Sequence, residues 1–188
     1  MTARIVMVCH GSTEALHRAA FPLDEGLDEQ GRRQVADAAR LFGTGSGRSL
    51  CGPSLRCRQT AAGLGLAAEP DEGLRDCDNG HWAGRTLADL QGQDPEGMMA
   101  WLTNPSAAPH GGESVLTLVG RVAAWLERRH QEGGKVVAVT HPAVMRAAVV
   151  HVLGTPPEAF WRIDAEPLSQ VRLTAHGGRW RLRLSPAS

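Results

Sequence analysis

The feature that most constrains this chain is a short β-branched run that ends directly in a histidine and a glycine. Residues 4–8 read Arg-Ile-Val-Met-Val, which predicts a buried strand, and Cys9, His10 and Gly11 follow at once. A glycine at that point lets the backbone approach a ligand closely, as an anion site at the carboxyl edge of a sheet requires. Taken alone, the His-Gly pair also fits an ordinary turn at a strand end, so the later segments decide between the two readings.

Length and charge narrow the classes of protein to consider. The 188 residues fit one domain over residues 1–188. Lys plus Arg and Asp plus Glu both number 20, which argues against a broad electrostatic surface for nucleic acid or membrane. We therefore expect anion binding to be local. Neither nucleic acid nor a membrane is expected as a partner.

Cysteine usage and the first residues indicate a cytoplasmic protein. The four cysteines show no Cys-x-x-Cys spacing, which predicts reduced thiols. The chain begins without the charged and apolar regions of a secretory signal. The most apolar stretch, residues 136–153, is interrupted by His141, Pro142 and Arg146, so it is too broken to span a bilayer.

Strands and helices are predicted to alternate along the chain. Strands are expected at residues 4–8, 48–51, 135–140, 169–174 and 179–184, and helices near 28–41, 55–62, 87–90, 94–105, 115–130 and 142–150. Residues 43–47 are expected to be a flexible connector, and Leu41 to end the apolar stripe of the helix before it. This order predicts a three-layer α/β/α sandwich around a mostly parallel sheet, with an antiparallel edge formed by the last two strands.

Two further segments point to an anion at the sheet edge. Arg56 and Arg58 fall in the first turns of a predicted helix, where a cation opposes the helix dipole unless an anion is bound there. Two solvated surface arginines are the simpler alternative. His141 ends the strand at 135–140, and Pro142 begins the next helix, whose free N–H groups would face an anion beside His141.

Five motifs, in order, resemble those of the histidine phosphatase (phosphoglycerate-mutase-like) superfamily, in its small phosphatase branch. They are Cys-His-Gly-Ser-Thr at 9–13, Gly-Pro-Ser-Leu-Arg-Cys-Arg-Gln-Thr-Ala at 52–61, Leu-Arg-Asp-Cys-Asp-Asn-Gly-His-Trp-Ala-Gly at 74–84, Gly-Gly-Glu-Ser at 111–114 and Thr-His-Pro at 140–142. Together they cover nearly the whole chain, so the resemblance implies the sandwich fold described above.

The resemblance also implies a phosphatase that needs no metal or other cofactor. His10 matches the histidine that attacks phosphorus and becomes a phosphohistidine, which water then cleaves. His141 and Arg56 match groups that neutralise the transferring oxygens, and Asp76 matches the residue that protonates the leaving oxygen. Cationic side chains and backbone N–H groups would supply the positive field.

The predicted phosphate pocket departs from the family pattern at several positions, Cys9 and Asp76 among them. Cys9, Gly11 and Ser12 complete the pocket, and His81 is expected at its mouth. Cys9 stands where the family has an arginine, and losing one preorganised donor costs about 10²–10³-fold in rate. Asp76 replaces the usual glutamate and is one methylene shorter.

The change at Cys9 leaves two functions open. One is a small-molecule phosphomonoester phosphatase in which Arg58, His81 or the substrate supplies the missing charge. The other is a degenerate family member with little or no phosphatase activity, which binds an anionic metabolite or a protein partner. Cys9 itself is either a small buried residue or a reactive thiol, and a zinc site made with His10 and His141 is a further alternative that lacks recognisable spacing. The substrate, and whether a homodimer forms, stay open.

Overall fold

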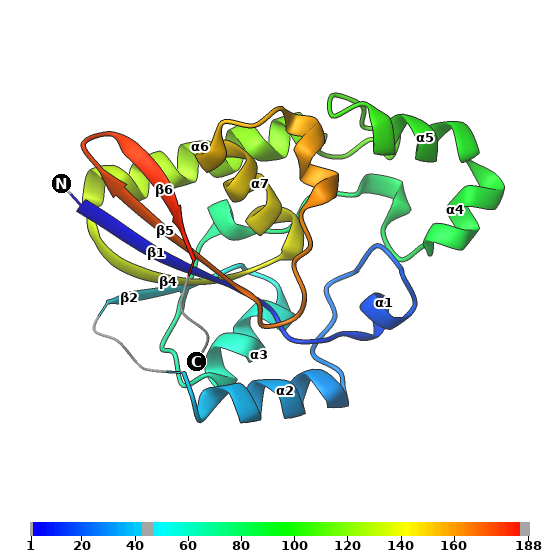
Figure 1. Cartoon of the computed structure of the whole chain (residues 1–188). Coiled ribbons are helices and arrows are strands. Elements are labelled where there is room, and N and C mark those ends of the chain that lie inside the picture. Colours follow the sequence, from blue (N-terminus) through cyan, green and yellow to red (C-terminus); the bar gives the residue numbers. More distant parts are fainter. Residues whose placement is uncertain (1, 43–46, 185–188) are drawn as a thin grey trace.

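A six-stranded sheet forms the centre of the computed structural model, which describes residues 2–42 and 47–184 (Figure 1). Its strands are β1 (Thr2–Cys9), β2 (Arg48–Cys51), β3 (Glu69–Pro70), β4 (Gly134–Thr140), β5 (Gln170–His176) and β6 (Arg179–Arg183). The strand order is β3-β2-β4-β1-β5-β6. Strands β1 to β4 run parallel, whereas β5 pairs antiparallel with β1 and β6 antiparallel with β5. The predicted mostly parallel sheet with an antiparallel edge is confirmed.

Helices cover both faces of this sheet. They are α1 (Glu14–His17), α2 (Glu29–Ala39), α3 (Leu55–Gly63), α4 (Leu87–Gln93), α5 (Pro95–Thr103), α6 (Val115–Glu132) and α7 (Pro142–Leu153), with short 3-10 segments η1 (Glu72–Leu74), η2 (Gly80–Trp82) and η3 (Pro157–Arg162). Figure 1 shows α6 and α7 on one face and α2 and α3 on the other. The three-layer sandwich expected from the sequence is therefore confirmed.

Alternating side chains of the strands fill two separate cores. Ile5, Met7 and Cys9 of β1 pack with the apolar faces of α6 and α7, whereas Val8 packs with α2 and α3 around Val35. This is the period-two pattern of a strand that is buried on both faces. A fully buried Leu, Ile or Met side chain contributes roughly 1.5–3 kcal/mol, so these cores hold the carboxyl ends of the strands in place.

The loop after β1 is fixed to the start of α2 by polar contacts. Oδ1 of Asp28 accepts the N–H of Gly31 at 2.6 Å, which is the cap expected from the sequence, and Oδ2 accepts the Ser12 hydroxyl at 2.9 Å. A Cβ on Gly31 would lie 2.2 Å from the Ser12 carbonyl oxygen, so only glycine allows this close approach. The placement of Leu41 on the apolar stripe was wrong: α2 ends at Ala39, and Leu41 is 90% exposed.

The remaining predicted elements agree closely with the structure, apart from small differences at their ends. Gly133 ends α6 at φ 70°, and Pro142 occupies the first turn of α7, both as expected. The sequence analysis missed α1, β3 and the 3-10 segments, which are all short. The predicted connector at 43–47 lies outside the described residues except for Gly47. Within the described part of the chain, no helix combines the length and apolarity needed to cross a membrane.

Candidate active site

The two histidines of the predicted site lie side by side because their strands are neighbours. In the parallel register of β1 and β4, Cys9 lies opposite Thr140, so His10 and His141 leave the sheet at the same edge. Their ring centres are 5.3 Å apart and the ring planes meet at 70°. Arg56, in the first turn of α3, and Asp76, after η1, reach the same point. Four residues from four different segments are thus brought together.

His10 has the protonation state that a nucleophile needs. Its Nδ1–H donates to the carbonyl oxygen of Gly11 at 2.8 Å, and because a carbonyl only accepts, this bond puts the proton on Nδ1 and leaves the lone pair on Nε2. Burial, together with the neighbouring positive charge of His141, lowers the pKa of His10 to about 4. The ring is therefore neutral near pH 7.

Asp76 joins Arg56 to His141 through one carboxylate oxygen. Oδ2 of Asp76 accepts an N–H of Arg56 at 2.8 Å and lies 3.2 Å from Nδ1 of His141. The second contact is an ion pair rather than an aligned hydrogen bond, since Nδ1 of His141 has no hydrogen-bond partner among the described residues. Oδ1 accepts the N–H of Cys77 at 2.9 Å. The carboxylate is consequently fixed on both oxygens.

The charges of this group keep His141 protonated and Asp76 ionised. Burial by itself would lower the pKa of His141, but the Asp76 carboxylate, with a smaller contribution from Cys57, outweighs burial and raises that pKa to about 9. Burial would raise the pKa of Asp76, but the charges of His141 and Arg56 outweigh it and hold that pKa well below its usual range. At rest the proton therefore belongs to His141, and the role of Asp76 as acid stays a prediction.

The segment that carries Asp76 is held from behind by a buried ion pair. Arg121 of α6 binds both carboxylate oxygens of Glu113 at 2.8 Å. Its remaining N–H groups donate to the backbone carbonyls of Gly73, Arg75 and Asp76 at 3.0–3.2 Å. The glutamate of the Gly-Gly-Glu-Ser motif, Glu113, therefore has a structural role: it orients Arg121, which supports the loop that carries Asp76.

Cys9 is a small buried residue with a neutral thiol. Its side chain is 1% exposed and packs in the core beneath α6 and α7. Burial raises its pKa far above the usual range for a thiol, with further contributions from Cys57 and Asp76, while Arg146 and Arg56 act in the opposite direction. The structure therefore favours the packing interpretation over a reactive thiol. Within residues 2–42 and 47–184, no three His, Cys, Asp or Glu side chains are grouped to hold a metal ion.

The other predicted binding residues divide into those at the site and those away from it. The N–H of Gly11 donates to Oγ1 of Thr60 at 3.0 Å, which ties the loop of His10 to α3. The hydroxyl of Ser12 is already bound to Asp28. Arg58 and His81 are exposed and line neither of the two hollows that contain Asp76. Neither side chain stands where the missing positive charge is needed.

Two hollows meet at Asp76 and together form the candidate active site. One, of about 210 Å³, contains His10 and Arg146, and the other, of about 390 Å³, contains Arg56 and Ser54. Pro22, Cys77 and Asn79 also line both. The sequence analysis missed Arg146 as a site residue. The sequence feature that points to Arg146 is its position as the single charged residue in the apolar run of α7, five residues after His141.

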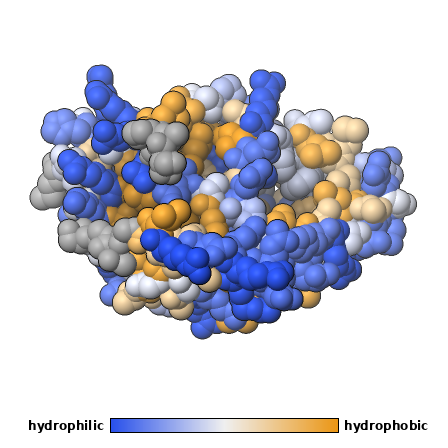
Figure 2. Space-filling model, turned by 60° about the horizontal axis from the view of Figure 1, so that its bottom comes forward, coloured by the Kyte–Doolittle hydropathy of each residue, from blue (hydrophilic) through white to orange (hydrophobic). Residues whose placement is uncertain are grey.

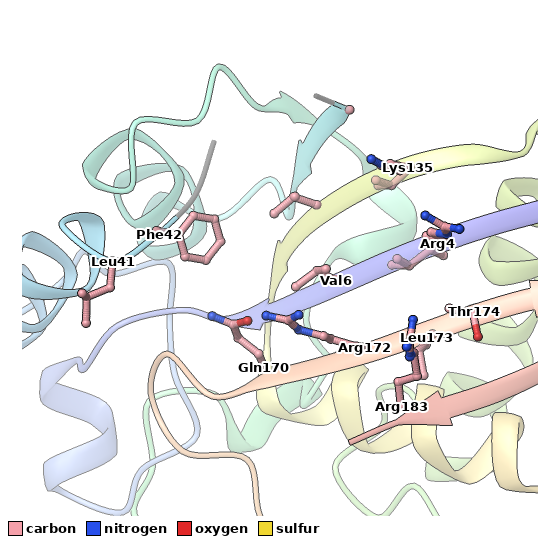
Figure 3. A pocket seen from close by; sticks show the side chains of 14 residues that line it. Arg4, Val6, Leu41, Phe42, Lys135, Gln170, Arg172, Leu173, Thr174 and Arg183 are labelled. Carbon is pink, nitrogen blue, oxygen red and sulfur yellow. The ribbon is translucent and has the colours of Figure 1, made fainter. Parts of the chain in front are cut away.

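A separate hollow of about 350 Å³ lies across β1, β4, β5 and β6. Figure 3 shows Arg4, Lys135, Arg172 and Arg183 around it, with Phe42 and Leu41 at one side. Figure 2 shows that the surface on the side of α2 is largely hydrophilic, with smaller apolar patches. The described residues that line this hollow include no His, Cys, Asp or Glu.

The fold and the site define an α/β protein with a neutral, oriented histidine at the carboxyl edge of the sheet, beside two cationic side chains. Comparison with known proteins gives the same class. The family model of the histidine phosphatase superfamily (branch 1) matches residues 5–186. The chain therefore belongs to the histidine phosphatase superfamily, as its motifs predicted.

Relatives and solved structures of this family are similar over almost the whole chain. Glucosyl-3-phosphoglycerate phosphatase of Mycobacterium tuberculosis is 31% identical over 182 residues, which are 93% of this chain and 70% of that protein. Adenosylcobalamin/alpha-ribazole phosphatase of Escherichia coli is 26% identical over 175 residues, which are 86% and 85% of the two chains. The native structure of the mycobacterial glucosyl-3-phosphoglycerate phosphatase has a TM-score of 0.86 at 28% identity and covers 100% of both chains. These homologues are phosphatases that act on small phosphorylated metabolites.

Proposed function

We propose that this chain hydrolyses a small phosphomonoester through a phosphohistidine on His10. The observation that carries the proposal is the hydrogen bond from Nδ1 of His10 to the Gly11 carbonyl, which leaves Nε2 free on a neutral ring. Nε2 attacks phosphorus, the P–N bond forms and the bond to the ester oxygen breaks. Water then attacks phosphorus, the P–N bond breaks, and inorganic phosphate leaves with His10 neutral again.

Arg56 and His141 hold the transferring oxygens in this proposal. Both are cations at the edge of the sheet, both are nearly inaccessible to solvent, and both already bind a carboxylate oxygen of Asp76. A dianionic phosphate entering between them would meet charge-assisted donors in a site of low dielectric, where such contacts are strongest. The N-terminus of α7, which begins at Pro142, adds free backbone N–H groups at the same point.

Asp76 is proposed as the acid that protonates the leaving oxygen, and His141 as the source of its proton. A bound phosphate places negative charge beside Asp76 and therefore raises the pKa of its carboxyl. Protonated His141 lies 3.2 Å away and can pass its proton from Nδ1 to Oδ2. The leaving alcohol takes that proton as the ester bond breaks, and the water of the second step returns one.

The experiment compares wild type with His10→Ala, and uses His151→Ala, an exposed histidine on α7, as the matched control. Hydrolysis of 4-nitrophenyl phosphate and benzyl phosphate is measured. Rapid quenching followed by mass spectrometry detects phosphate on the peptide of His10. We expect turnover and a base-stable, acid-labile adduct in wild type and in His151→Ala, and neither in His10→Ala. Turnover that survives in His10→Ala would overturn the phosphohistidine route.

A degenerate binding protein is the second candidate function, and Cys9 is the observation that favours it. Cys9 brings no charge to the position before the nucleophile. Absence of turnover in wild type, together with activity in Cys9→Arg, would support this candidate. Because Cys9 is buried in the core, thermal unfolding of Cys9→Arg and Cys9→Ala must be compared first. Turnover in wild type that Cys9→Arg does not increase would count against it.

We also infer a single domain over residues 1–188, a cytoplasmic location and a small-molecule partner rather than nucleic acid. All four cysteines are free thiols, which supports a reducing compartment. The balanced charge of 20 basic and 20 acidic residues supports the choice of partner. Whether the chain forms a homodimer is tested by sedimentation at several protein concentrations.

A further inference from the structure

The hollow beside His10 has an aromatic wall. Trp101 lies between Phe21 and Trp161, with ring-centre distances of 5.4 and 4.1 Å, and Phe160 lies 4.9 Å from Trp161. All four rings line the hollow that contains His10. They come from the loop after α1, from α5 and from η3, so three distant segments build one wall. Edge-to-face packing between the rings stabilises the wall in a fixed shape.

Two hydrogen-bond donors of residues that line this hollow have no partner. Nε of Arg146 and Nε1 of Trp161 are both buried, and neither makes a hydrogen bond within the described residues. Leaving a buried donor unpaired is unfavourable, and an acceptor on a ligand would relieve that penalty. The guanidinium carbon of Arg146 lies 5.7 Å from the ring centre of Phe160. The cation is thereby held against the aromatic wall.

Arg146 is the one lysine or arginine among the described residues that line this hollow. Its α7 helix begins directly after His141, so the guanidinium stands on the same element as the phosphate-binding N-terminus but beyond it. A planar guanidinium with free N–H groups matches a carboxylate in geometry and charge. A carboxylate on the substrate, at the end away from phosphorus, would therefore satisfy it.

Few groups in the hollow are able to bind a polyol. Apart from the catalytic residues, Arg146 and the indole N–H groups, the polar side chains of the lining are those of Thr13, Asn79 and Cys77, and the thiol of Cys77 already donates to the Glu113 carbonyl. A sugar placed here would leave several hydroxyl groups without partners, and each of them would lose its bonds to water. The lining instead favours a flat, largely apolar body.

We propose that the substrate is a phosphomonoester whose alcohol part is a flat apolar group bearing a carboxylate, an inference that rests on the proposed phosphatase function. The flat group lies against Trp101 and Trp161, and the carboxylate binds Arg146 and accepts Nε1–H of Trp161. The phosphate then lies at His10. This assigns the hollow of about 210 Å³ to the leaving group and makes Arg146 a specificity-determining residue.

Three substrates test the proposal: 4-carboxybenzyl phosphate, benzyl phosphate and glucose 6-phosphate. All are esters of primary alcohols, so the bond that breaks is closely matched. We expect kcat/KM to be highest for 4-carboxybenzyl phosphate, about 10–100-fold above benzyl phosphate, because a charge-assisted hydrogen bond contributes about 1.5–3 kcal/mol. Glucose 6-phosphate should be the poorest of the three.

Matched variants assign the preference to the two donors. Arg146→Gln should reduce the ratio of kcat/KM between the carboxylated and plain benzyl esters towards one. Arg129→Gln is the control, because Arg129 has the same unpaired Nε and lies 5.8 Å from the ring of Trp125, but is on α6 and outside the hollow. Trp161→Phe, which removes the Nε1–H donor but keeps an aromatic ring, should raise KM more for 4-carboxybenzyl phosphate than for benzyl phosphate and so reduce the same ratio. Trp180→Phe, which removes an equally unpaired Nε1 from β6, should leave that ratio unchanged.

The outcomes separate this inference from the proposed function. Equal kcat/KM for all three esters, or a preference for glucose 6-phosphate, overturns the substrate class while leaving the phosphatase in place. If none of the three esters is hydrolysed, the proposed function fails. Calorimetry with benzylphosphonate and 4-carboxybenzylphosphonate then tests whether the hollow binds a carboxylated aromatic group. Tighter binding of the carboxylated phosphonate, lost in Arg146→Gln, would support the inference, and equal binding would overturn it.

Discussion

Nδ1 of His10 donates a hydrogen bond of 2.8 Å to the carbonyl oxygen of Gly11, its immediate neighbour in the chain. This bond fixes the ring orientation and the tautomer together, because only a protonated Nδ1 can donate to a carbonyl. The glycine after the histidine is explained by close packing. A Cβ on Gly11 would lie 3.1–3.2 Å from Val35, Gly31 and Leu27, which is closer than ordinary contacts of a Cβ atom. The proposed nucleophile is thus oriented by its own turn.

The pH profile should have two limbs set by the two histidines. Activity needs neutral His10 and should fall as pH decreases through about 4, and it needs protonated His141 and should fall as pH increases through about 9. The measurement is kcat/KM between pH 3.5 and 10. Two esters with different phosphate pKa values separate the enzyme limbs from ionisation of the substrate. An alkaline limb near the ordinary histidine value of about 6.5 would contradict the assignment for His141.

Removing the charge of Asp76 should lower the pKa of His141. In Asp76→Asn the carboxylate that outweighs burial is absent, so the pKa of His141 should fall from about 9 to below 6.5, as followed by the NMR shift of its ring protons. In wild type the raised pKa contributes stability that is fully present below pH 6.5 and is lost as pH increases through about 9. This contribution is up to about 3 kcal/mol. Urea unfolding at pH 6 and 9.5 should show that loss in wild type but not in Asp76→Asn.

Arg121→Met should destabilise the protein and also impair catalysis without touching the substrate. The substitution removes the close partner of the buried Glu113, which keeps only the ion pair with Arg75 at 3.7 Å, and it removes three hydrogen bonds to the backbone around Asp76. Breaking a buried ion pair by removing one partner costs about 3–5 kcal/mol. Urea unfolding measures this cost, and kcat of the folded fraction measures the displacement of Asp76.

The control for Arg121 is the double variant with Glu113→Gln. Removing the charge of Glu113 should recover part of the free energy of unfolding. We expect kcat to stay low, because the Arg121 N–H groups that donate to the backbone are still missing. Equal kcat in wild type and in Arg121→Met would contradict the positioning role. Recovery of kcat in the double variant would instead assign the whole loss of kcat to the charge of Glu113.

Cys9 should resist alkylation in the folded protein. Its thiol is buried and its pKa lies far above that of a free cysteine, so almost no thiolate forms near neutral pH. Burial also raises the pKa of Cys77 to about 12, with Asp76 and Glu113 adding to the shift. Mass spectrometry after treatment with iodoacetamide at pH 7.5 should find Cys9 unmodified in native protein and labelled in urea. Rapid labelling of Cys9 together with loss of activity would restore the reactive-thiol interpretation.

The sequence predicted the fold well because the deciding patterns are local. The β-branched runs at 4–8 and 135–140, the N-cap at Asp28 and the proline at the first position of α7 each depend on neighbouring residues only. The missed α1 and β3 are four and two residues long, too short for a periodic pattern to form. Leu41 was misplaced because periodicity does not reveal where a helix ends.

The site was predictable only as far as strand order allowed. Adjacent parallel strands bring His10 and His141 to one edge, and the motifs added Arg56 and Asp76. Arg146 and the aromatic wall were missed, because the segments that carry Trp101 and Trp161 meet only through tertiary packing. The ionised state of Asp76 was equally hidden, since it depends on the distance to two cations rather than on its place in a motif.

Two helical glycines should respond in opposite directions to replacement by alanine. In Gly31→Ala the new Cβ would meet the Ser12 carbonyl oxygen at 2.2 Å, so the loop that carries His10 must shift, and overpacking of this kind costs about 1–3 kcal/mol. In Gly120→Ala, on the exposed face of α6, no atom lies within 4 Å of the Cβ. Alanine should therefore stabilise that helix by about 0.5–1 kcal/mol through its higher helix propensity. Urea unfolding of both variants measures the difference, and kcat should fall only in Gly31→Ala. A Gly31→Ala protein with the stability and kcat of wild type would contradict the close packing of α2 on the loop of the nucleophile.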